Sequence, residues 1–223
     1  MQLYLIRHAE SQNNARPVHN RVEDPTITPV GHLQAEHLAG WMKSLKFDHL
    51  ITSPFKRTLQ TTRYVFDVTD HTVHVWHHVF EQGGCFKGFG PDAKEGAPGL
   101  GRTSVVDHFP ADRCIADETI SEQGWWFGKQ RETPQDHSTR VTSVIDRINQ
   151  TFGDSEQVVT MVVHAQFERE LLHQLVPHAS IPQLGFIKNC SITKLNNVGN
   201  NWQLDWFNSI THMPAKLITG SEI

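Results

Sequence analysis

Two adjacent residues near the start of the chain, Arg7 and His8, have side chains that together suit a phosphoryl group. A guanidinium group makes bidentate, charge-assisted hydrogen bonds to phosphate oxygens, and an imidazole nitrogen can attack phosphorus. The pair directly follows the apolar residues 3–6, a pattern typical of a buried strand that ends at a polar site. Such a pair is also common as surface or capping chemistry, so the ends of the other strands must decide its role.

Three other predicted strands end in residues of related chemistry. The clearest is the β-branched, apolar run 158–163, which leads directly into His164. A shorter strand precedes the helix that carries Arg57 in its first turn, and another strand ends at Glu81. The carboxyl ends of parallel strands meet at one edge of a sheet, where ligands gather. We therefore expect two histidines, two arginines and one glutamate to face a common crevice.

Each of these residues also has a purely structural interpretation. Arg57 alone fits a surface helix residue, Glu81 a solvated cap and His164 a hydrogen-bonded core histidine. All of these residues are predicted at strand ends, however, and such a joint placement is much less plausible as a coincidence. The constellation is therefore read as a phosphate pocket.

The elements that must position these residues alternate along the chain. Strands are predicted at residues 3–6, 48–52, 73–80 and 158–163, with a hairpin at 191–195 and 202–207. Helices are predicted from Thr28-Pro29 to residue 45, over 56–66, over 138–152 and across 167–175. This order predicts an α/β fold, a three-layer sandwich with a mostly parallel central sheet, in a single domain over residues 1–223. The tail 209–223 lacks periodicity and is either docked or mobile.

The segment 82–136 differs from the rest of the chain. It is rich in glycine, has few periodic apolar residues, and carries Trp125, Trp126 and Phe127. A loop of this length inside a compact domain is usually functional, so we expect an insertion with some helix that lies over the site as a lid. A packed subdomain without a catalytic part is the alternative. The three aromatic side chains either anchor this insertion or form an apolar wall for the substrate.

Composition and charge exclude several classes of partner. The formal charge of −4 over 223 residues argues against a nucleic-acid or anionic-membrane surface. No run reaches transmembrane length, and the first predicted strand begins at the second or third residue with no leader before it. An odd number of cysteines without CxxC spacing indicates free thiols of a reducing compartment: Cys85, Cys114 and Cys190. We therefore expect a cytoplasmic protein; its oligomeric state is not predicted.

Histidine is abundant, but its spacing does not predict a metal site. Among 15 histidines the best candidate cluster is His71, His74, His77 and His78. A strand in which polar residues alternate with Val73 and its neighbours explains this pattern as well. No metal and no cofactor is expected.

With these residues in order, the chain resembles the histidine phosphatase superfamily, the phosphoglycerate-mutase-like proteins. The family's Arg-His-Gly-Glu-Ser motif is similar to residues 7–11 (Arg-His-Ala-Glu-Ser), and its Ser-Pro-x-x-Arg-x-x-Gln-Thr motif to residues 53–61. The family's second histidine corresponds to His164, and Arg169 stands where the family often has an arginine. The late run 189–193 also resembles the family. The likeness lapses only in the glycine-rich insertion.

The resemblance implies a role for each pocket residue. His8 would be the nucleophile that forms a phosphohistidine, with its ring oriented through the other N–H. Arg7, Arg57 and a protonated His164 would bind the phosphoryl oxygens and offset charge in the transition state. Asn14 would add a neutral donor to the phosphate.

Glu81 is the expected proton donor to the leaving oxygen, and then the base that activates water. Glu10, Glu95 and Glu118 also lie in or near candidate loops and are alternatives.

Three positions depart from the family's pattern. Ala9 and Ala165 replace glycines that usually follow the two histidines, and Val163 stands where a smaller residue is common. An extra methyl group close to a bound phosphate could narrow the pocket.

The reaction class follows from the same comparison of motifs. The resemblance implies a phosphoric monoester hydrolase of the histidine acid phosphatase type that acts on a small phosphorylated metabolite. Mutases of the family carry an arginine pair and a proline pair in the insertion, whereas this chain has Arg102-Thr103-Ser104 and a single Pro110 there. A phosphoglycerate-mutase-type phosphotransferase and a non-catalytic protein that binds phosphorylated ligands remain the alternatives.

Overall fold

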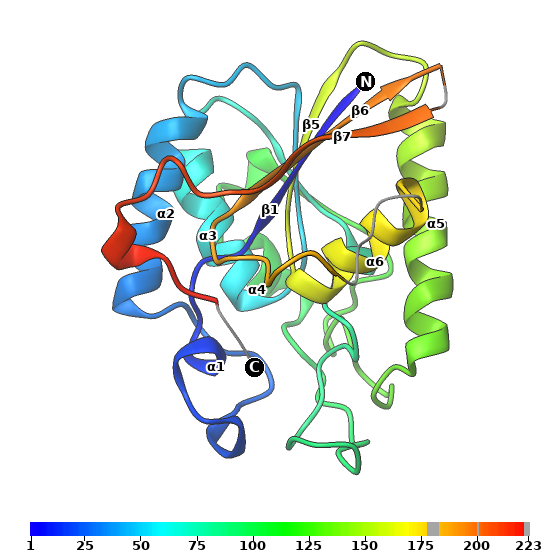
Figure 1. Ribbon diagram of the computed structural model, residues 1–223. Helices are drawn as coiled ribbons and strands as arrows, with labels where there is room; N and C mark the ends of the chain where they lie inside the picture. The colour runs from blue at the N-terminus through cyan, green and yellow to red at the C-terminus, as the bar shows by residue number, and fades with distance from the viewer. Residues whose placement is uncertain (178–182, 200, 221–223) are drawn as a thin grey trace.

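The computed structural model describes residues 1–177, 183–199 and 201–220 (Figure 1). The strands are β1 (Gln2–Arg7), β2 (His49–Thr52), β3 (Val73–Val75), β4 (Cys114–Ala116), β5 (Val158–Val163), β6 (Ile192–Val198) and β7 (Asn201–Ser209). The helices are α1 (Gln12–Ala15), α2 (Pro29–Met42), α3 (Lys56–Asp67), α4 (Arg102–Val106), α5 (Pro134–Phe152) and α6 (Ala165–Leu175). Short 3-10 turns are η1 (Val18–Asn20), η2 (His77–Val79), η3 (Ala111–Arg113) and η5 (Ala215–Leu217).

The strands form one sheet in the order β4-β3-β2-β5-β1-β6-β7. The first five strands in this order are parallel to one another, whereas β6 is antiparallel to β1 and β7 to β6. β1 and β5 are central neighbours, and Arg7 pairs with Val163 at their carboxyl ends. The predictions of a mostly parallel sheet and of a C-terminal hairpin are both confirmed.

Alternate side chains of the central strands enter two separate cores. Tyr4 and Ile6 of β1 pack in the core that includes residues of α2 and α3, whereas Leu3 and Leu5 pack with residues of α5 and α6. Figure 1 shows these two helix pairs on opposite sides of the sheet. Successive strand residues point to opposite faces, so a strand covered on both faces must be apolar throughout. The predicted three-layer sandwich is therefore confirmed.

Side-chain caps determine where two of the helices begin. Thr28 accepts a hydrogen bond from the backbone N of Gly31 (3.0 Å), with Pro29 in the first turn of α2, as predicted. α5 begins at Pro134 rather than at residue 138, because Thr133 caps it by accepting from the backbone N of Asp136 (3.2 Å). The Thr-Pro pair that begins α2 thus recurs at the start of α5, as Thr133-Pro134.

The strand predicted over 73–80 is wrong in its length. Only Val73–Val75 pairs in the sheet, and His77–Val79 form a 3-10 turn. The backbone N of His77 donates to the carboxylate of Asp117 (2.9 Å), and the His77 ring hydrogen-bonds Thr119 (2.8 Å). These contacts hold the chain out of the strand path, so Glu81 follows a turn rather than a strand.

The segment 82–136 contains regular structure, including α4 and the edge strand β4, which pairs in parallel with β3. Trp125 and Trp126 are almost fully buried, whereas Phe127 is 55% exposed. The two tryptophans therefore anchor this segment in the core and do not form a wall of the pocket.

Two glycines allow this anchoring. Gly84 and Gly99 both have positive φ (70° and 69°). A Cβ at Gly84 would lie 2.5 Å from the Trp126 ring, and one at Gly99 would lie 2.3 Å from the Trp125 ring. Only glycine combines this conformation with such close approach, which gives part of the glycine content a packing role.

The C-terminal tail is docked as far as residue 220. Leu217 is buried and its carbonyl accepts a hydrogen bond from the side chain of Gln34 (2.7 Å). Gln34 also donates to the hydroxyl of Thr219 (2.8 Å), whose carbonyl accepts from the backbone N of Asn189 (3.1 Å). Of the two alternatives for the tail, docking holds for these residues, and 221–223 lie outside the described part.

Three remaining predictions concern membranes, metals and thiols. Within residues 1–177, 183–199 and 201–220, no helix is long and apolar enough to cross a membrane. Over the same residues no group of three or more His, Cys, Asp or Glu side chains is arranged to hold a metal ion. All three cysteines are free and buried.

Candidate active site

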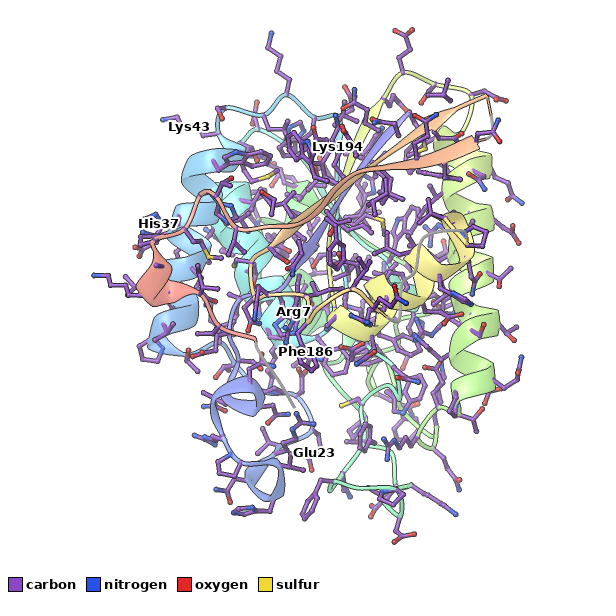
Figure 2. All side chains as sticks on the ribbon, in the orientation of Figure 1. Arg7, Glu23, His37, Lys43, Phe186 and Lys194 are labelled. Carbon is purple, nitrogen blue, oxygen red and sulfur yellow. The ribbon has the colours of Figure 1, made fainter. Side chains whose placement is uncertain are left out.

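The two histidines meet where the central strands end. His8 follows β1 and donates its backbone N–H to the carbonyl of Val163 (3.0 Å), while His164 follows β5 directly. Their ring centroids are 5.3 Å apart, and both rings are buried. Figure 2 shows Arg7 at the same end of β1, above the loop that carries Glu23.

Arg57 connects the two imidazoles from the first turn of α3. Its Nε donates to Nε2 of His8 (3.2 Å), and its Nη2 lies 3.1 Å from Nδ1 of His164. The guanidinium group also packs over the ring of Phe55, with Cζ 4.0 Å from the ring centroid.

The hydrogen bonds of His8 determine its tautomer. Nδ1 lies 2.7 Å from the carbonyl oxygen of Ala9. A carbonyl can only accept, so Nδ1 carries the proton and Nε2 keeps a free lone pair. Burial lowers the pKa of His8 well below its usual value, and the charges of Arg57 and Arg7 lower it further. His8 is therefore a neutral imidazole at pH 7.

Without a ligand, His164 also favours the neutral form; its expected protonation beside a bound phosphate stays a prediction. Its pKa lies well below the usual value, first because of burial and then because of Arg57 and His8. Arg57 donates to Nδ1, so Nε2 carries the proton and donates to the hydroxyl of Ser53 (2.8 Å). With these neighbours a second positive charge beside Arg57 is too costly.

Arg7 remains charged although it is buried. Burial lowers its pKa to about 10, and the nearby carboxyl groups of Glu81 and Glu168 oppose this shift. Its Nη1 donates to the carbonyl of Ile187, while its Nε is buried without a hydrogen-bond partner. An unpaired buried donor of a guanidinium group is available to a phosphoryl oxygen.

Glu81 lies at the first turn of α6. Its Oε1 accepts hydrogen bonds from the backbone N of Phe167 (3.1 Å), Gln166 (3.2 Å) and Gln82 (2.9 Å). The carboxylate thus occupies the positive end of a helix dipole, at the edge of the same crevice.

The amide oxygen of Asn14 is held by its neighbours. Its Oδ1 accepts from the backbone N of Ser11 (3.1 Å), the Ser11 hydroxyl (2.9 Å) and Nδ2 of Asn189 (3.3 Å). With the oxygen engaged, the two N–H donors of Asn14 remain for an anion.

One cavity of about 310 Å³ joins five of the six predicted site residues: Arg7, His8, Asn14, Arg57 and Glu81. The sixth residue, His164, does not line the cavity, but its Nδ1 lies 3.1 Å from Nη2 of Arg57, which does. The alternative acids Glu10, Glu95 and Glu118 do not line this cavity. Neither does Arg169, whose guanidinium group donates to the carbonyls of residues 184 and 185.

Several residues of the site have no role assigned from the sequence. Ser53 orients His164, and the hydroxyl of Thr61 accepts from the backbone N of Ala9 (3.0 Å); both lie in the motif 53–61 and could have been found there. Asn189 donates to the carbonyl of His8 (3.0 Å) from the late motif. Arg21 lines the cavity without any sequence signal.

Comparison with known proteins places this geometry in a family. A protein from Enterobacter sp. named as a probable phosphoglycerate mutase is 37% identical over 67 residues, 30% of this chain and 31% of that protein. A broad-specificity phosphatase of Saccharomyces cerevisiae is 33% identical over 67 residues, 29% of each chain. The sequence match thus spans less than a third of the length of these relatives.

The fold has solved counterparts as well. A crystal structure of a phosphoserine phosphatase variant from Entamoeba histolytica, in complex with phosphoserine, superposes with a TM-score of 0.64. It covers 96% of this chain and 99% of that one at 20% identity, a likeness of fold alone. The model of the histidine phosphatase superfamily (branch 1) matches residues 3–98 and 108–210. With this match over most of its length, the chain belongs to branch 1 of the histidine phosphatase superfamily.

Proposed function

We propose that this protein hydrolyses small phosphomonoesters through a phosphohistidine on His8. The observation that carries this proposal is the unprotonated Nε2 of His8, which receives the Nε–H of Arg57 at 3.2 Å inside a cavity that Arg7 also lines. A neutral nucleophile beside two guanidinium groups suits attack on an anionic phosphoryl group.

In the first half of the reaction, Nε2 of His8 forms a bond to phosphorus and the bond from phosphorus to the leaving oxygen breaks. Arg7, Arg57 and the amide of Asn14 bind the equatorial oxygens, where charge accumulates. A phosphoryl dianion between these groups would also raise the pKa of His164, so that His164 becomes a charged donor only when phosphate is present.

Glu81 serves both halves of the reaction. Protonated, it gives its proton to the leaving oxygen, which departs as an alcohol. As a carboxylate, it then takes a proton from a water molecule, whose oxygen attacks phosphorus while the bond to Nε2 breaks. The products are inorganic phosphate, free His8 and a protonated Glu81.

The low pKa of His8 supports a phosphatase of the acid type. Because burial, Arg57 and Arg7 hold the pKa of His8 well below its usual value, the neutral nucleophile persists under acidic conditions. We propose an optimum of kcat/KM on the acid side of neutrality.

The insertion supplies one side of the cavity and is proposed as a lid. Gln82, Gly84, Phe86 and residues 88–90 line the cavity opposite the loop of residues 18–23. Closure of such a loop would exclude water that is not poised by Glu81.

Mutase chemistry is less well supported. Arg102, the arginine in the region where mutases carry a pair, donates to the carbonyls of Asp117 (2.8 Å) and Ala116 (3.0 Å). It is not among the residues that line the cavity. Its guanidinium group is therefore engaged in holding β4 and not placed to bind a substrate.

The test is to assay the purified protein with p-nitrophenyl phosphate and with 3-phosphoglycerate, at several pH values. We expect hydrolysis of the aryl ester, loss of phosphate release in His8→Ala, and a circular dichroism spectrum of this variant like that of the native protein. Isomerisation of 3-phosphoglycerate faster than its hydrolysis would establish a mutase. Unchanged turnover in His8→Ala would refute the mechanism, and phosphate binding without turnover in the native protein would indicate a binding protein.

A further inference from the structure

The outer part of the cavity differs in chemistry from its phosphate end. Beyond His8 and Arg57, it is lined from one side by Val18 and Val22 and from the other by Phe86 and Phe89. Figure 1 shows these two segments as separate loops that extend past the same end of the sheet. The leaving group of a phosphate bound at His8 would enter this outer part of the cavity.

Three of these side chains are large, apolar and exposed. Val18 is 37% exposed, Val22 41% and Phe89 50%. Single exposed apolar side chains are ordinary on a protein surface, but here three of them line one cavity from two loops. Apolar surface that gathers at the mouth of a polar cavity is typical of a ligand site.

The aromatic side of this mouth is held in place by Arg131. Its guanidinium carbon lies 4.2 Å from the ring centroid of Phe86, and its Nη1 donates to the carbonyls of Gly90 (2.7 Å) and Ala93 (3.3 Å). Arg131 is thus occupied by the loop itself. These contacts hold the loop at Phe86, Gly90 and Ala93, and Phe89 lies in the same loop.

Arg21 is the cation of the mouth. Its Nε is buried without a hydrogen-bond partner, and among the residues described here no carboxylate lies within 4.0 Å of it. The acids that share the cavity are Glu81 and Glu23. A guanidinium plane without a bidentate partner offers a flat surface on which an aromatic ring stacks.

We propose that the preferred substrates are phosphomonoesters whose alcohol carries an aromatic ring, held between Phe89 and Val22 and stacked on Arg21. This inference rests on the proposed phosphatase function and names its substrate class. The cavity of about 310 Å³ is near the lower end of the range for small-molecule sites, roughly 300 Å³, so one compact ring system fits and a chain of rings does not.

The test compares alkyl phosphates that leave as alcohols of similar acidity: 2-phenylethyl, 2-cyclohexylethyl, ethyl and 2-carboxyethyl phosphate. We expect the KM of the native protein for 2-phenylethyl phosphate to be about tenfold lower than for ethyl phosphate, with the cyclohexyl ester between them. Equal KM values for the phenyl and ethyl esters would overturn the proposal.

Variants locate the effect. In Phe89→Ser and Val22→Ser, the phenylethyl-to-ethyl KM ratio should shift about fivefold toward unity. Arg21→Gln should raise the KM for the phenyl ester more than the KM for the cyclohexyl ester. The matched control is Phe127→Ser, because Phe127 is 55% exposed in the same insertion but does not line the cavity. An equal shift in Phe127→Ser and Phe89→Ser would contradict the proposal.

Two further outcomes are informative. Preference for the 2-carboxyethyl ester, lost in Arg21→Gln, would mean that Arg21 reads a second anionic group and would overturn the aromatic assignment. Titration calorimetry with 2-phenylethylphosphonate and ethylphosphonate separates the two hypotheses. Tighter binding of the phenyl compound without hydrolysis of any ester would support the aromatic site and refute the phosphatase function. Equal binding of the two phosphonates by a protein that hydrolyses the esters would support the phosphatase function and refute the aromatic site.

Discussion

Nε of Arg57 donates a hydrogen bond to Nε2 of His8 across 3.2 Å, so the cation that would bind the phosphoryl group also holds the lone pair that would attack it. The same guanidinium group contacts Nδ1 of His164 at 3.1 Å. One side chain therefore contacts both imidazoles and, after burial, is the largest cause of the low pKa of each.

Replacement of Arg57 should change the pH dependence as well as the rate. After burial, the charge of Arg57 is the largest cause of the low pKa of His8, so Arg57→Gln should raise that pKa toward its usual value. The acid limb of kcat/KM should move to higher pH, and kcat should fall by about 10²–10³-fold. Arg63→Gln, an exposed arginine of the same helix, is the control. An acid limb that stays in place would show that Arg57 does not set the pKa of His8.

The hydroxyl of Thr61 should matter for kcat. It accepts from the backbone N of Ala9 (3.0 Å) and donates to the carbonyl of Arg57 (2.7 Å), and the carbonyl of Ala9 in turn holds Nδ1 of His8. Thr61→Val should lower kcat about tenfold with little change in KM, because the nucleophile is less well oriented. Thr151→Val is a matched control, since Thr151 makes the same bond to the carbonyl four residues earlier (2.7 Å) at an exposed position of α5. Similar kinetics for the two variants would contradict this role.

Glu168 should make the protein less stable as pH rises. It is fully buried in α6, and burial raises its pKa from 4.5 to about 8. Between these values the unfolded chain ionises and the native carboxyl does not. This group therefore lowers the free energy of unfolding by up to about 1.4 kcal/mol per pH unit from roughly pH 4.5 to 8.

Urea unfolding at pH 5.5 and pH 8 measures this slope. Glu168→Gln and Glu168→Leu should both lose it. In Glu170→Gln it should persist, because hydrogen bonds from Ser138 and Gln174 outweigh burial and lower the pKa of Glu170. If both Glu168 variants kept the native change of unfolding free energy with pH, another group would be responsible for it.

The ion pair of Glu132 and Arg140 should stabilise the fold, and this stabilisation should be lost at low pH. Nε and Nη2 of Arg140 donate to the Glu132 carboxylate at 2.7 and 2.9 Å, and both side chains are buried. Burial alone would raise the pKa of Glu132, but the hydrogen bonds from Arg140 and His137 lower it to about 2. The stabilisation is complete above pH 4.5 and is lost as pH falls toward 2.

Glu132→Gln should therefore lower the free energy of unfolding at pH 7 by about 3–5 kcal/mol, because it leaves Arg140 buried without a counter-charge. Glu95→Gln, which removes an exposed ion pair with Lys87, should change the free energy of unfolding far less, because solvent screens that pair. Chemical denaturation at pH 7 compares the two. Equal losses would mean that burial of the Glu132 pair adds nothing.

The sequence by itself predicts the layered α/β fold and five of the residues that line the proposed active-site cavity. Apolar runs such as 158–163 signal strands covered on both faces, and the residue that follows each central strand must lie at the common edge of a parallel sheet. For that reason His8, Arg57 and His164 could be placed together without coordinates.

Other features depend on contacts between distant segments and could not be predicted. β3 ends at Val75 because Asp117, more than 40 residues later, binds the backbone of His77. The tail is docked because Gln34 binds Leu217 and Thr219. Such partners leave no local pattern in the chain.

The protonation states were decided only by the tertiary structure. The residue types allow a charged His164, but burial beside Arg57 makes it neutral, and the carbonyl of Ala9 selects the tautomer of His8. Likewise, Val18, Val22 and Phe89 are unremarkable in sequence until two loops bring them to one cavity. Sequence patterns report which residues share an edge of the sheet, whereas charge state and ligand shape depend on distances and burial that exist only in the folded chain.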